Sequence, residues 1–255
     1  MSAIFNMAAD MYLLHQCVDS ETLFLRTYTW NRPSITIGKI QDPQAVLDMS
    51  NIQRDGAEWI RRPTGGRPVL HYQDCTYSCV FSHKLRSLGG SVKETYAIFS
   101  NCLKCALKKI GIDSSIHDSD NLFNELKRQQ KLPCFLAPNR DEIMVDGKKF
   151  IGSAQRRTRE GVLQHGSIPI SDAYLRLPLY LNIDESEWDR QIDLLRNKTI
   201  HLSAINPAIT CMQVAFAITE GFSESLDCSI DLLPWSSYEL ATIQEIMANY
   251  NNGVY

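Results

Sequence analysis

An arginine- and glycine-rich segment at residues 61–71 has the residue types of an anion-binding loop. It reads Arg-Arg-Pro-Thr-Gly-Gly-Arg-Pro-Val-Leu-His, a predicted strand end that runs into a glycine turn. The paired glycines Gly65 and Gly66 let the backbone approach a ligand, and exposed N–H and guanidinium groups can hold phosphate or carboxylate. A tight hairpin turn with solvated arginines would use the same residues, and an isolated Gly-Gly pair favours that interpretation.

A second segment combines a predicted hairpin with a lysine whose orientation matters. The Asp-Gly pair at 146–147 is what a two-residue type I′ turn requires, so residues 142–153 predict a β-hairpin. Lys149 would then lie on the same strand face as Ile151 and Ser153. If that face is the inner one, the ammonium group needs an oxygen partner such as a substrate carbonyl. A surface lysine beside the turn is equally consistent with the periodicity.

Cys134 stands in the proline-bracketed stretch Leu-Pro-Cys-Phe-Leu-Ala-Pro, where a helix is disfavoured and an exposed loop thiol is favoured. A thiolate there could act as a nucleophile. A single cysteine is weak support, because most cysteines are inert core residues. The eight cysteines are scattered along the chain, which is not the pattern of a small disulfide scaffold.

The elements that must position these side chains are predicted from hydrophobic periodicity and turn residues. An amphipathic helix is expected over residues 6–18, where Met7, Met11, Leu14 and Val18 follow one stripe. β-Branched and aromatic residues predict further strands at 22–30, 34–38, 59–62, 75–81 and 161–170.

A long helix is predicted to begin at Ser91, which forms a capping box with Glu94, and to end at Gly111. Its apolar face would comprise Val92, Tyr96, Phe99, Leu103, Leu107 and Ile110. Three more helices are expected at 185–196, 207–219 and 236–249. We therefore expect a single domain over 1–255, with a catalytic core at 1–200 and a helical C-terminal extension at 201–255.

Composition narrows the classes of function. A formal net charge of −3 and a pI near 6.1 argue against nucleic acid as the main partner. No apolar run approaches the ~18 residues of a membrane span, and the first residues lack a basic region before an apolar stretch. A cytoplasmic protein is therefore expected.

Several motifs occur together in an order that resembles the catalytic domain of biotin and lipoate protein ligases. They are Asn6-Met7-Ala8, Pro33 to Gly38 with Gln41, Arg61 to His71, Thr76-Tyr77-Ser78, Cys134-Phe135, Lys148-Lys149-x-x-Gly152-Ser153-Ala154-Gln155 and Leu163 to Ile168. Within that superfamily the set is most similar to the cysteine-dependent octanoyltransferases and lipoyl amidotransferases. The resemblance covers about residues 3–250.

The resemblance implies both a fold and a set of roles. The fold would be α+β (α/β), a mixed β-sheet flanked by helices with a short helical C-terminal tail and an apolar slot for a medium-length acyl chain. Lys149 would anchor the acyl carbonyl, and Cys134 would accept the acyl group. The substrate-binding residues would be Arg61, Arg62, Gly65, Gly66, Arg67, His71, Gly152, Ser153, Ala154, His165 and Gly166. No metal and no cofactor would be required.

The implied reaction moves an octanoyl or lipoyl group to a target lysine through a thioester on Cys134. The donor would be octanoyl acyl carrier protein or lipoylated H-protein, and the acceptor a lipoyl domain of a 2-oxoacid dehydrogenase E2 or H-protein. His71 or His165 could assist proton transfer, and either could be structural. The modestly basic region 140–159 could dock an acidic carrier, or it could be a solvated hairpin surface.

Two other classes of function remain open at this point. An ATP-dependent lipoate ligase, which needs ATP and Mg²⁺ to form a lipoyl-adenylate, would share the lysine and the arginine-glycine loop. Arg67, where such ligases commonly continue the glycine run, and Cys134 both argue against it. A non-catalytic binder of lipoyl domains is the second alternative. A cysteine-based metal protein has little support, because Cys75 and Cys79 would share one strand face and packing explains them.

Overall fold

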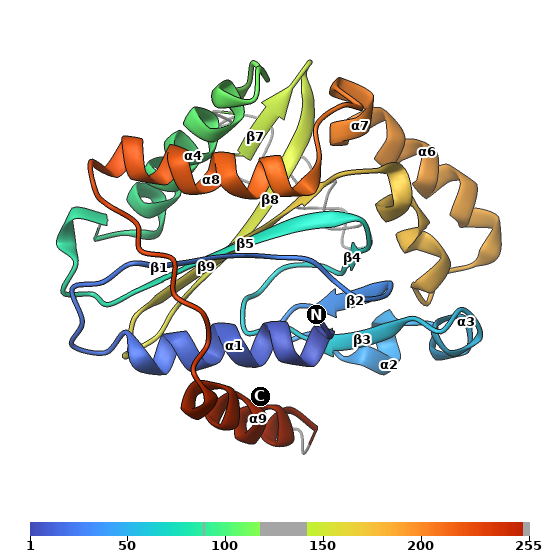
Figure 1. The fold of residues 1–255 in the computed structure, drawn as a ribbon. Helices are drawn as coiled ribbons and strands as arrows, with labels where there is room; N and C mark the ends of the chain where they lie inside the picture. The colour runs from blue at the N-terminus through green and yellow to red at the C-terminus, as the bar shows by residue number, and fades with distance from the viewer. Residues whose placement is uncertain (89, 118–141, 252–255) are drawn as a thin grey trace.

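Two β-sheets and the helices that cover them form the described part of the chain (Figure 1). The computed structural model describes residues 1–88, 90–117 and 142–251. Helices cover both faces of the larger sheet, which confirms the expected fold of a sheet flanked by helices.

The large sheet has six strands in the order β1-β5-β9-β8-β7-β6, and all neighbouring pairs are antiparallel. The strands are β1 (Phe24–Tyr28), β5 (Asp74–Phe81), β9 (Val162–Pro169), β8 (Lys148–Arg157), β7 (Glu142–Val145) and β6 (Ser115–His117). The β7–β8 hairpin is confirmed. Its turn residues Asp146 and Gly147 both have positive φ, 50° and 72°, as a type I′ turn requires.

The small sheet has three strands in the order β3-β2-β4, with β3 at Glu58–Arg61, β2 at Ser34–Ile37 and β4 at Val69–His71. Strands β2 and β3 are parallel, whereas β2 and β4 are antiparallel, so the mixed character of the fold comes from this sheet. The short helices α2 (Pro43–Val46) and α3 (Met49–Arg54) connect β2 to β3. The sequence did not predict β4 or β6.

Helices α4 (Val92–Lys109) and α8 (Cys211–Leu226) cover one face of the large sheet (Figure 1). Helix α4 begins after Ser91, and both hydrogen bonds of the expected capping box with Glu94 are present. Helix α8 begins four residues later than expected, because Thr210 caps it. A Cβ added at Gly221 would lie 2.5 Å from the backbone N of Ala106, so a glycine allows these two helices to pack closely.

Helices α1 (Ala3–Gln16) and α9 (Ser237–Asn251) pack against each other beside the opposite face. Met11 and Leu14 of α1 are buried there with Ile243 of α9. Val18 is 44% exposed, contrary to the predicted stripe, because α1 ends at Gln16. Helix α8 belongs to the main core, and the division of the chain at residue 200 stays a prediction.

The remaining elements lie at the periphery of the two sheets. They are the 3₁₀ segments η1 (Arg86–Leu88), η3 (Asp172–Tyr180) and η4 (Glu185–Glu187), and the helices α6 (Trp188–Lys198) and α7 (Leu202–Ile205). The helix expected at 185–196 is thus divided into η4 and α6.

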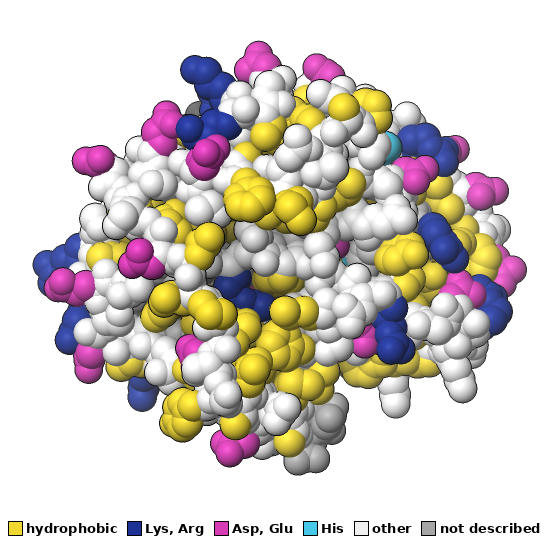
Figure 2. All heavy atoms as spheres, viewed as in Figure 1, with side chains coloured by type: hydrophobic (Ala, Val, Ile, Leu, Met, Phe, Trp, Pro, Cys, Tyr) yellow, Lys and Arg dark blue, Asp and Glu magenta, His cyan; other side chains and the backbone are white. Residues whose placement is uncertain are grey.

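The molecular surface mixes charged and hydrophobic side chains. Figure 2 shows hydrophobic side chains gathered over α8, where Met212 and Phe216, one helical turn apart, are 69% and 59% exposed. Within residues 1–88, 90–117 and 142–251, no helix combines the length and the apolar character needed to cross a membrane.

Candidate active site

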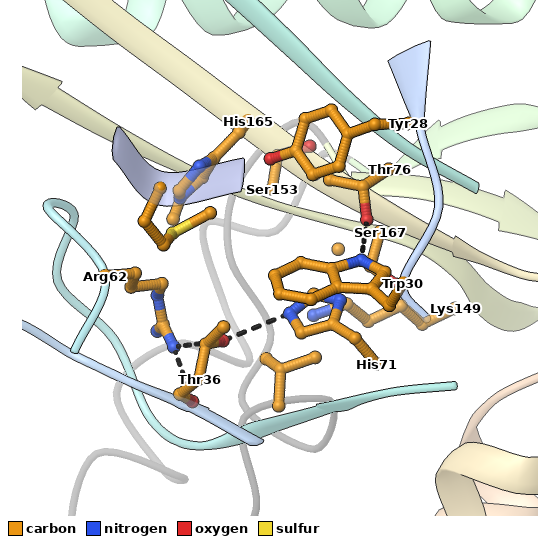
Figure 3. A pocket seen from close by; sticks show the side chains of 15 residues that line it. Tyr28, Trp30, Thr36, Arg62, His71, Thr76, Lys149, Ser153, His165 and Ser167 are labelled. Atoms are coloured by element: carbon orange, nitrogen blue, oxygen red, sulfur yellow. Dashed lines mark hydrogen bonds between the residues drawn. The ribbon is translucent and has the colours of Figure 1, made fainter. Parts of the chain in front are cut away.

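A partly enclosed pocket lies where α1, the small sheet and the large sheet meet (Figure 3). It contains about 520 Å³ of space between atoms, part of it open to solvent. Its apolar wall is formed by Met7, Tyr28, Trp30 and Val69. Its remaining wall is formed by Thr36, Arg62, His71, Thr76, Lys149, Gly152, Ser153, Ala154, His165, Gly166 and Ser167.

Eight of the predicted site residues therefore meet around one space, although they come from distant parts of the sequence. They are Arg62, His71, Lys149, Gly152, Ser153, Ala154, His165 and Gly166. Strand pairing brings several of them together: Gly152 pairs with Ser167, and Ala154 with His165. Arg61, Gly65, Gly66 and Arg67 are not among the residues that line the pocket.

A β-bulge decides which way Lys149 points. Ile143 pairs with Ile151, but the next residue of β7, Met144, pairs with Lys149, so Phe150 is an extra residue on β8. Phe150 and Ile151 both pack into the core with α4 and α8, whereas Lys149 lines the pocket. The expectation that Lys149 shares a face with Ile151 is therefore wrong, because the bulge interrupts the regular alternation of side chains.

The ammonium group of Lys149 is buried and paired with a carboxylate. Its Nζ lies 2.5 Å from Oε1 of Glu142, and the two side chains are 7% and 4% exposed. A buried ammonium needs such a partner, because an uncompensated charge away from water is costly. The sequence did not single out Glu142. Its contact with Lys149 depends on the bulged register of the hairpin, for which the sequence carries no clear signal.

The arginine-glycine loop is held together by Arg62 from the inside. This buried guanidinium donates to the carbonyl oxygens of Thr36 at 3.0 Å, Gly65 at 2.7 Å and Arg67 at 2.8 Å. Arg61 donates to the carbonyl oxygens of Lys39, at 2.9 Å, and of Gln41. These bonds go to the protein's own backbone, so both guanidinium groups support the loop and the pocket wall that it forms.

His71 is held on both sides of its ring. Its Nδ1 lies 2.8 Å from Oδ2 of Asp74, and its Nε2 lies 3.1 Å from Oγ1 of Thr36. Arg62 also donates to that hydroxyl, at 3.2 Å. A carboxylate only accepts hydrogen bonds, so the Nδ1–H of His71 donates to Asp74. Figure 3 shows the chain of bonds from Arg62 through Thr36 to His71.

His165 is held in a similar way at the α1 side of the pocket. Its Nε2 lies 2.7 Å from Oγ1 of Thr64, and its Nδ1 lies 3.3 Å from Oδ2 of Asp10. Burial lowers the pKa of His165 despite the neighbouring Asp10, so the ring is neutral at pH 7. Burial alone would raise the pKa of Asp10, but the Arg26 guanidinium and the bond to His165 lower it overall, so this carboxylate is charged.

Both histidines thus use both ring nitrogens to bind protein groups. This arrangement favours a role in shaping the pocket over direct proton exchange with a substrate. Asp10 and Asp74, which orient the two rings, were not predicted from the sequence. The only local signal for either is the short spacing between His71 and Asp74.

Cys134 lies outside the described residues. Burial raises the pKa of the Cys17 thiol to about 11 and that of the Cys102 thiol to about 12. Cys75 and Cys79 both pack against α4 and α8, which confirms that they share one strand face. No described cysteine lines the pocket, and the described ranges hold no group of three or more His, Cys, Asp or Glu side chains that could bind a metal ion.

Comparison with known proteins gives relatives over nearly the whole chain. The chain is 34% identical to octanoyltransferase LipM of Kyrpidia tusciae over 263 residues, covering 98% of this chain and 92% of that protein. It is 30% identical to octanoyltransferase LipM of Bacillus subtilis over 250 residues, covering 96% and 90%.

Solved structures with the same fold include lipoate protein ligases. The bi-partite lipoate protein ligase of Thermoplasma acidophilum superimposes with a TM-score of 0.80 at 19% identity, covering 97% of this chain and 89% of that one. Lipoate-protein ligase A bound with ATP gives a TM-score of 0.78 at 19% identity, covering 98% and 92%. The family model of the lipoyl protein ligase A/B catalytic domain matches residues 2–223. The chain therefore belongs to the lipoyl protein ligase A/B catalytic domain family.

Proposed function

We propose that this chain is an acyltransferase that moves an octanoyl group to a target lysine in protein lipoylation, through a thioester on Cys134. One observation carries the proposal: the buried ammonium of Lys149 lines a partly apolar pocket. Relatives that match this chain over nearly its whole length are named octanoyltransferases. The reaction takes place in the cytoplasm and needs no cofactor.

The proposed chemistry has two steps. The thiolate of Cys134 attacks the thioester carbonyl of the donor, the bond from acyl carbon to carrier sulfur breaks, and the carrier leaves as a thiol after taking up a proton. The ε-amine of the acceptor lysine then attacks the acyl-enzyme, an amide forms, and the amine's proton returns the sulfur of Cys134 to the thiol. Lys149 would donate to the acyl oxygen as negative charge develops on it.

The pocket wall suits an acyl chain. Met7, Tyr28, Trp30 and Val69 give an apolar lining to the pocket that Lys149 also lines. Burying roughly six methylene groups at ~0.8 kcal/mol each would contribute about 5 kcal/mol before the cost of ordering the chain. That is enough to favour a medium-length chain over a short one.

The partners follow from the reaction. The donor of the octanoyl group is octanoyl acyl carrier protein, and the acceptor is a lipoyl domain of a 2-oxoacid dehydrogenase E2 or H-protein. The similar ligase of Thermoplasma acidophilum was studied with its E2 lipoyl domain, which supports an acceptor of this kind. Arg156, within the modestly basic region 140–159, donates to the Pro63 carbonyl at 3.2 Å, beside the pocket-lining Arg62.

An ATP-dependent ligase is the second candidate, because the solved structures of this fold include lipoate-protein ligase A bound with ATP. Those structures are 19% identical to this chain, so their likeness bears on the fold and not on the activity. The relatives at 30–34% identity are named octanoyltransferases. The transferase is therefore preferred.

Intact-mass measurement after incubation with octanoyl carrier protein, in the absence of ATP, tests the proposal. We expect an octanoyl adduct on the unaltered protein and on Cys228→Ser, which removes an exposed thiol, but not on Cys134→Ser. Lipoylation of a lipoyl domain only with lipoate and ATP would establish the ligase instead. Binding of a lipoyl domain without adduct or product would leave a non-catalytic binder.

A further inference from the structure

We infer that Glu142 is a positioning residue of this enzyme, which holds the Lys149 ammonium charged and directed into the pocket where the acyl carbonyl binds. The inference rests on the proposed function. The observation that carries it is the buried pair between Glu142 Oε1 and Lys149 Nζ at 2.5 Å.

The backbone of the hairpin brings the two side chains together. On β7, Ile143 and Val145 pack into the core with α4 and α8, so the alternation of the strand turns Glu142 to the other side. On β8 the extra residue Phe150 turns Lys149 to that same side. Without the bulge, Lys149 would follow Ile151 into the core, and the pair could not form.

The contact is compatible with substrate binding. An ammonium has three N–H donors, so a bond to Glu142 does not by itself block a bond to a carbonyl oxygen. The carboxylate favours the charged form of the amine, and only that form can stabilise an oxyanion by charge. Three other ionisable side chains line the same pocket as Lys149: Arg62 before β4, His71 on β4 and His165 on β9. Asp74 on β5 contacts His71, and Tyr174 on η3 contacts Thr199, which forms a β-bridge with Lys149.

Stability alone does not explain the pair. Buried ion pairs can often be replaced by apolar residues of similar volume without loss of stability, because desolvation offsets the attraction. Val145, Phe150 and Ile151 show that this hairpin already packs apolar side chains well. Because Lys149 lines the pocket, the pair is better explained by the chemistry of the pocket.

The first test measures the charge state of Lys149 without using activity. The full-length protein is labelled with acetic anhydride over a range of pH, and the modification of Lys149 is followed by peptide mass spectrometry. In Glu142→Gln, which keeps the shape but removes the charge, we expect half-maximal modification at a pH lower by about one to three units. Glu142→Asp, which keeps the charge, should stay close to the unaltered protein.

A matched control removes the carboxylate from another lysine pair. Glu224 lies 2.6 Å from Lys109 on the outer side of α8 and α4, and is 63% exposed. Glu224→Gln should leave both the modification of Lys149 and the transfer rate unchanged.

The second test measures the rate of octanoyl transfer against pH. In Glu142→Gln we expect kcat to fall about tenfold or more, with the alkaline limb of its profile moved to lower pH by the same amount as the labelling curve. KM for the carrier should stay the same, because Glu142 acts through Lys149. Glu142→Asp should restore the position of the limb.

The outcomes separate the inference from the proposed function. Labelling curves and pH profiles that coincide in Glu142→Gln and the unaltered protein overturn the inference. An unaltered protein that transfers no octanoyl group overturns the proposed function, while the labelling test still decides on Glu142. If Glu142→Gln unfolds, the melting temperature of the double variant Glu142→Gln/Lys149→Met decides. Recovery of the melting temperature supports a carboxylate that serves the lysine. Continued unfolding shows a structural role of Glu142 and overturns the inference.

Discussion

The indole of Trp30 lies flat on the imidazole of His71, with ring centroids 4.2 Å apart and an interplanar angle of 18°. Trp30 also donates through Nε1 to Oγ1 of Thr76 at 2.9 Å. Both rings line the pocket, and Trp30 is 8% exposed. A large, fixed apolar side chain at this place limits the length or width of any chain that the pocket accepts.

Trp30→Ala should therefore widen the range of acyl donors. We expect kcat/KM for a dodecanoyl donor, relative to an octanoyl donor, to rise about tenfold or more, because each buried methylene contributes ~0.8 kcal/mol. The free energy of unfolding should fall by about 3–5 kcal/mol. Trp59→Ala, at a position 38% exposed on β3, is the control. An unchanged preference for octanoyl would contradict a role of Trp30 in chain-length selection.

Arg62→Lys should loosen the arginine-glycine loop although it keeps the charge. A lysine cannot reproduce the planar fork that reaches the carbonyl oxygens of Thr36, Gly65 and Arg67. We expect the free energy of unfolding, measured in urea, to fall by about 1–3 kcal/mol. Arg176→Lys, at a side chain 51% exposed and paired with Asp55, should change it by less than about 1 kcal/mol. Equal losses of unfolding free energy in Arg62→Lys and Arg176→Lys would show that the planar fork of Arg62 is unimportant.

Stability should fall as the pH drops below the ordinary pKa of histidine, because of His165. Burial lowers the pKa of this ring in the folded protein below its usual 6.5, so the unfolded chain binds the proton more readily. The stabilisation is complete above pH 6.5 and is lost progressively below it, with a slope of at most about 1.4 kcal/mol per pH unit. His165→Gln should flatten this slope, whereas the exposed His83→Gln should preserve it. If the slope persists in His165→Gln, other titrating groups cause the dependence of stability on pH.

Gly221→Ala should force α8 away from α4. The added Cβ would lie 2.5 Å from N and 2.7 Å from Cα of Ala106, and backbone atoms cannot give way as a flexible side chain would. We expect a loss of about 1–3 kcal/mol from crowding, larger than the gain in helix propensity of about 1 kcal/mol. Thermal unfolding measures this loss of stability, and Glu220→Ala, at an exposed position of the same helix, is the control. A higher melting temperature would show that the helices can separate without cost.

Local features of the fold were predictable from short stretches of sequence. The capping box of Ser91 and Glu94 and the turn at Asp146 and Gly147 are both present, because the bonds and dihedral angles involved lie within a few residues. Strand β4 was not predicted, since its three residues follow directly on a glycine- and proline-rich loop that reads as a turn.

The sequence motifs also indicated eight of the residues that line the pocket, but not the carboxylates that hold them in place. Motifs pointed to Lys149, His71 and His165, yet only the folded structure decided that Glu142 holds the first, Asp74 the second and Asp10 the third. The reason is physical. Capping and turn formation depend on neighbours along the chain, whereas a one-residue bulge at Phe150 or a contact between Asp10 and His165 depends on strand register and packing between distant segments, which no local pattern encodes.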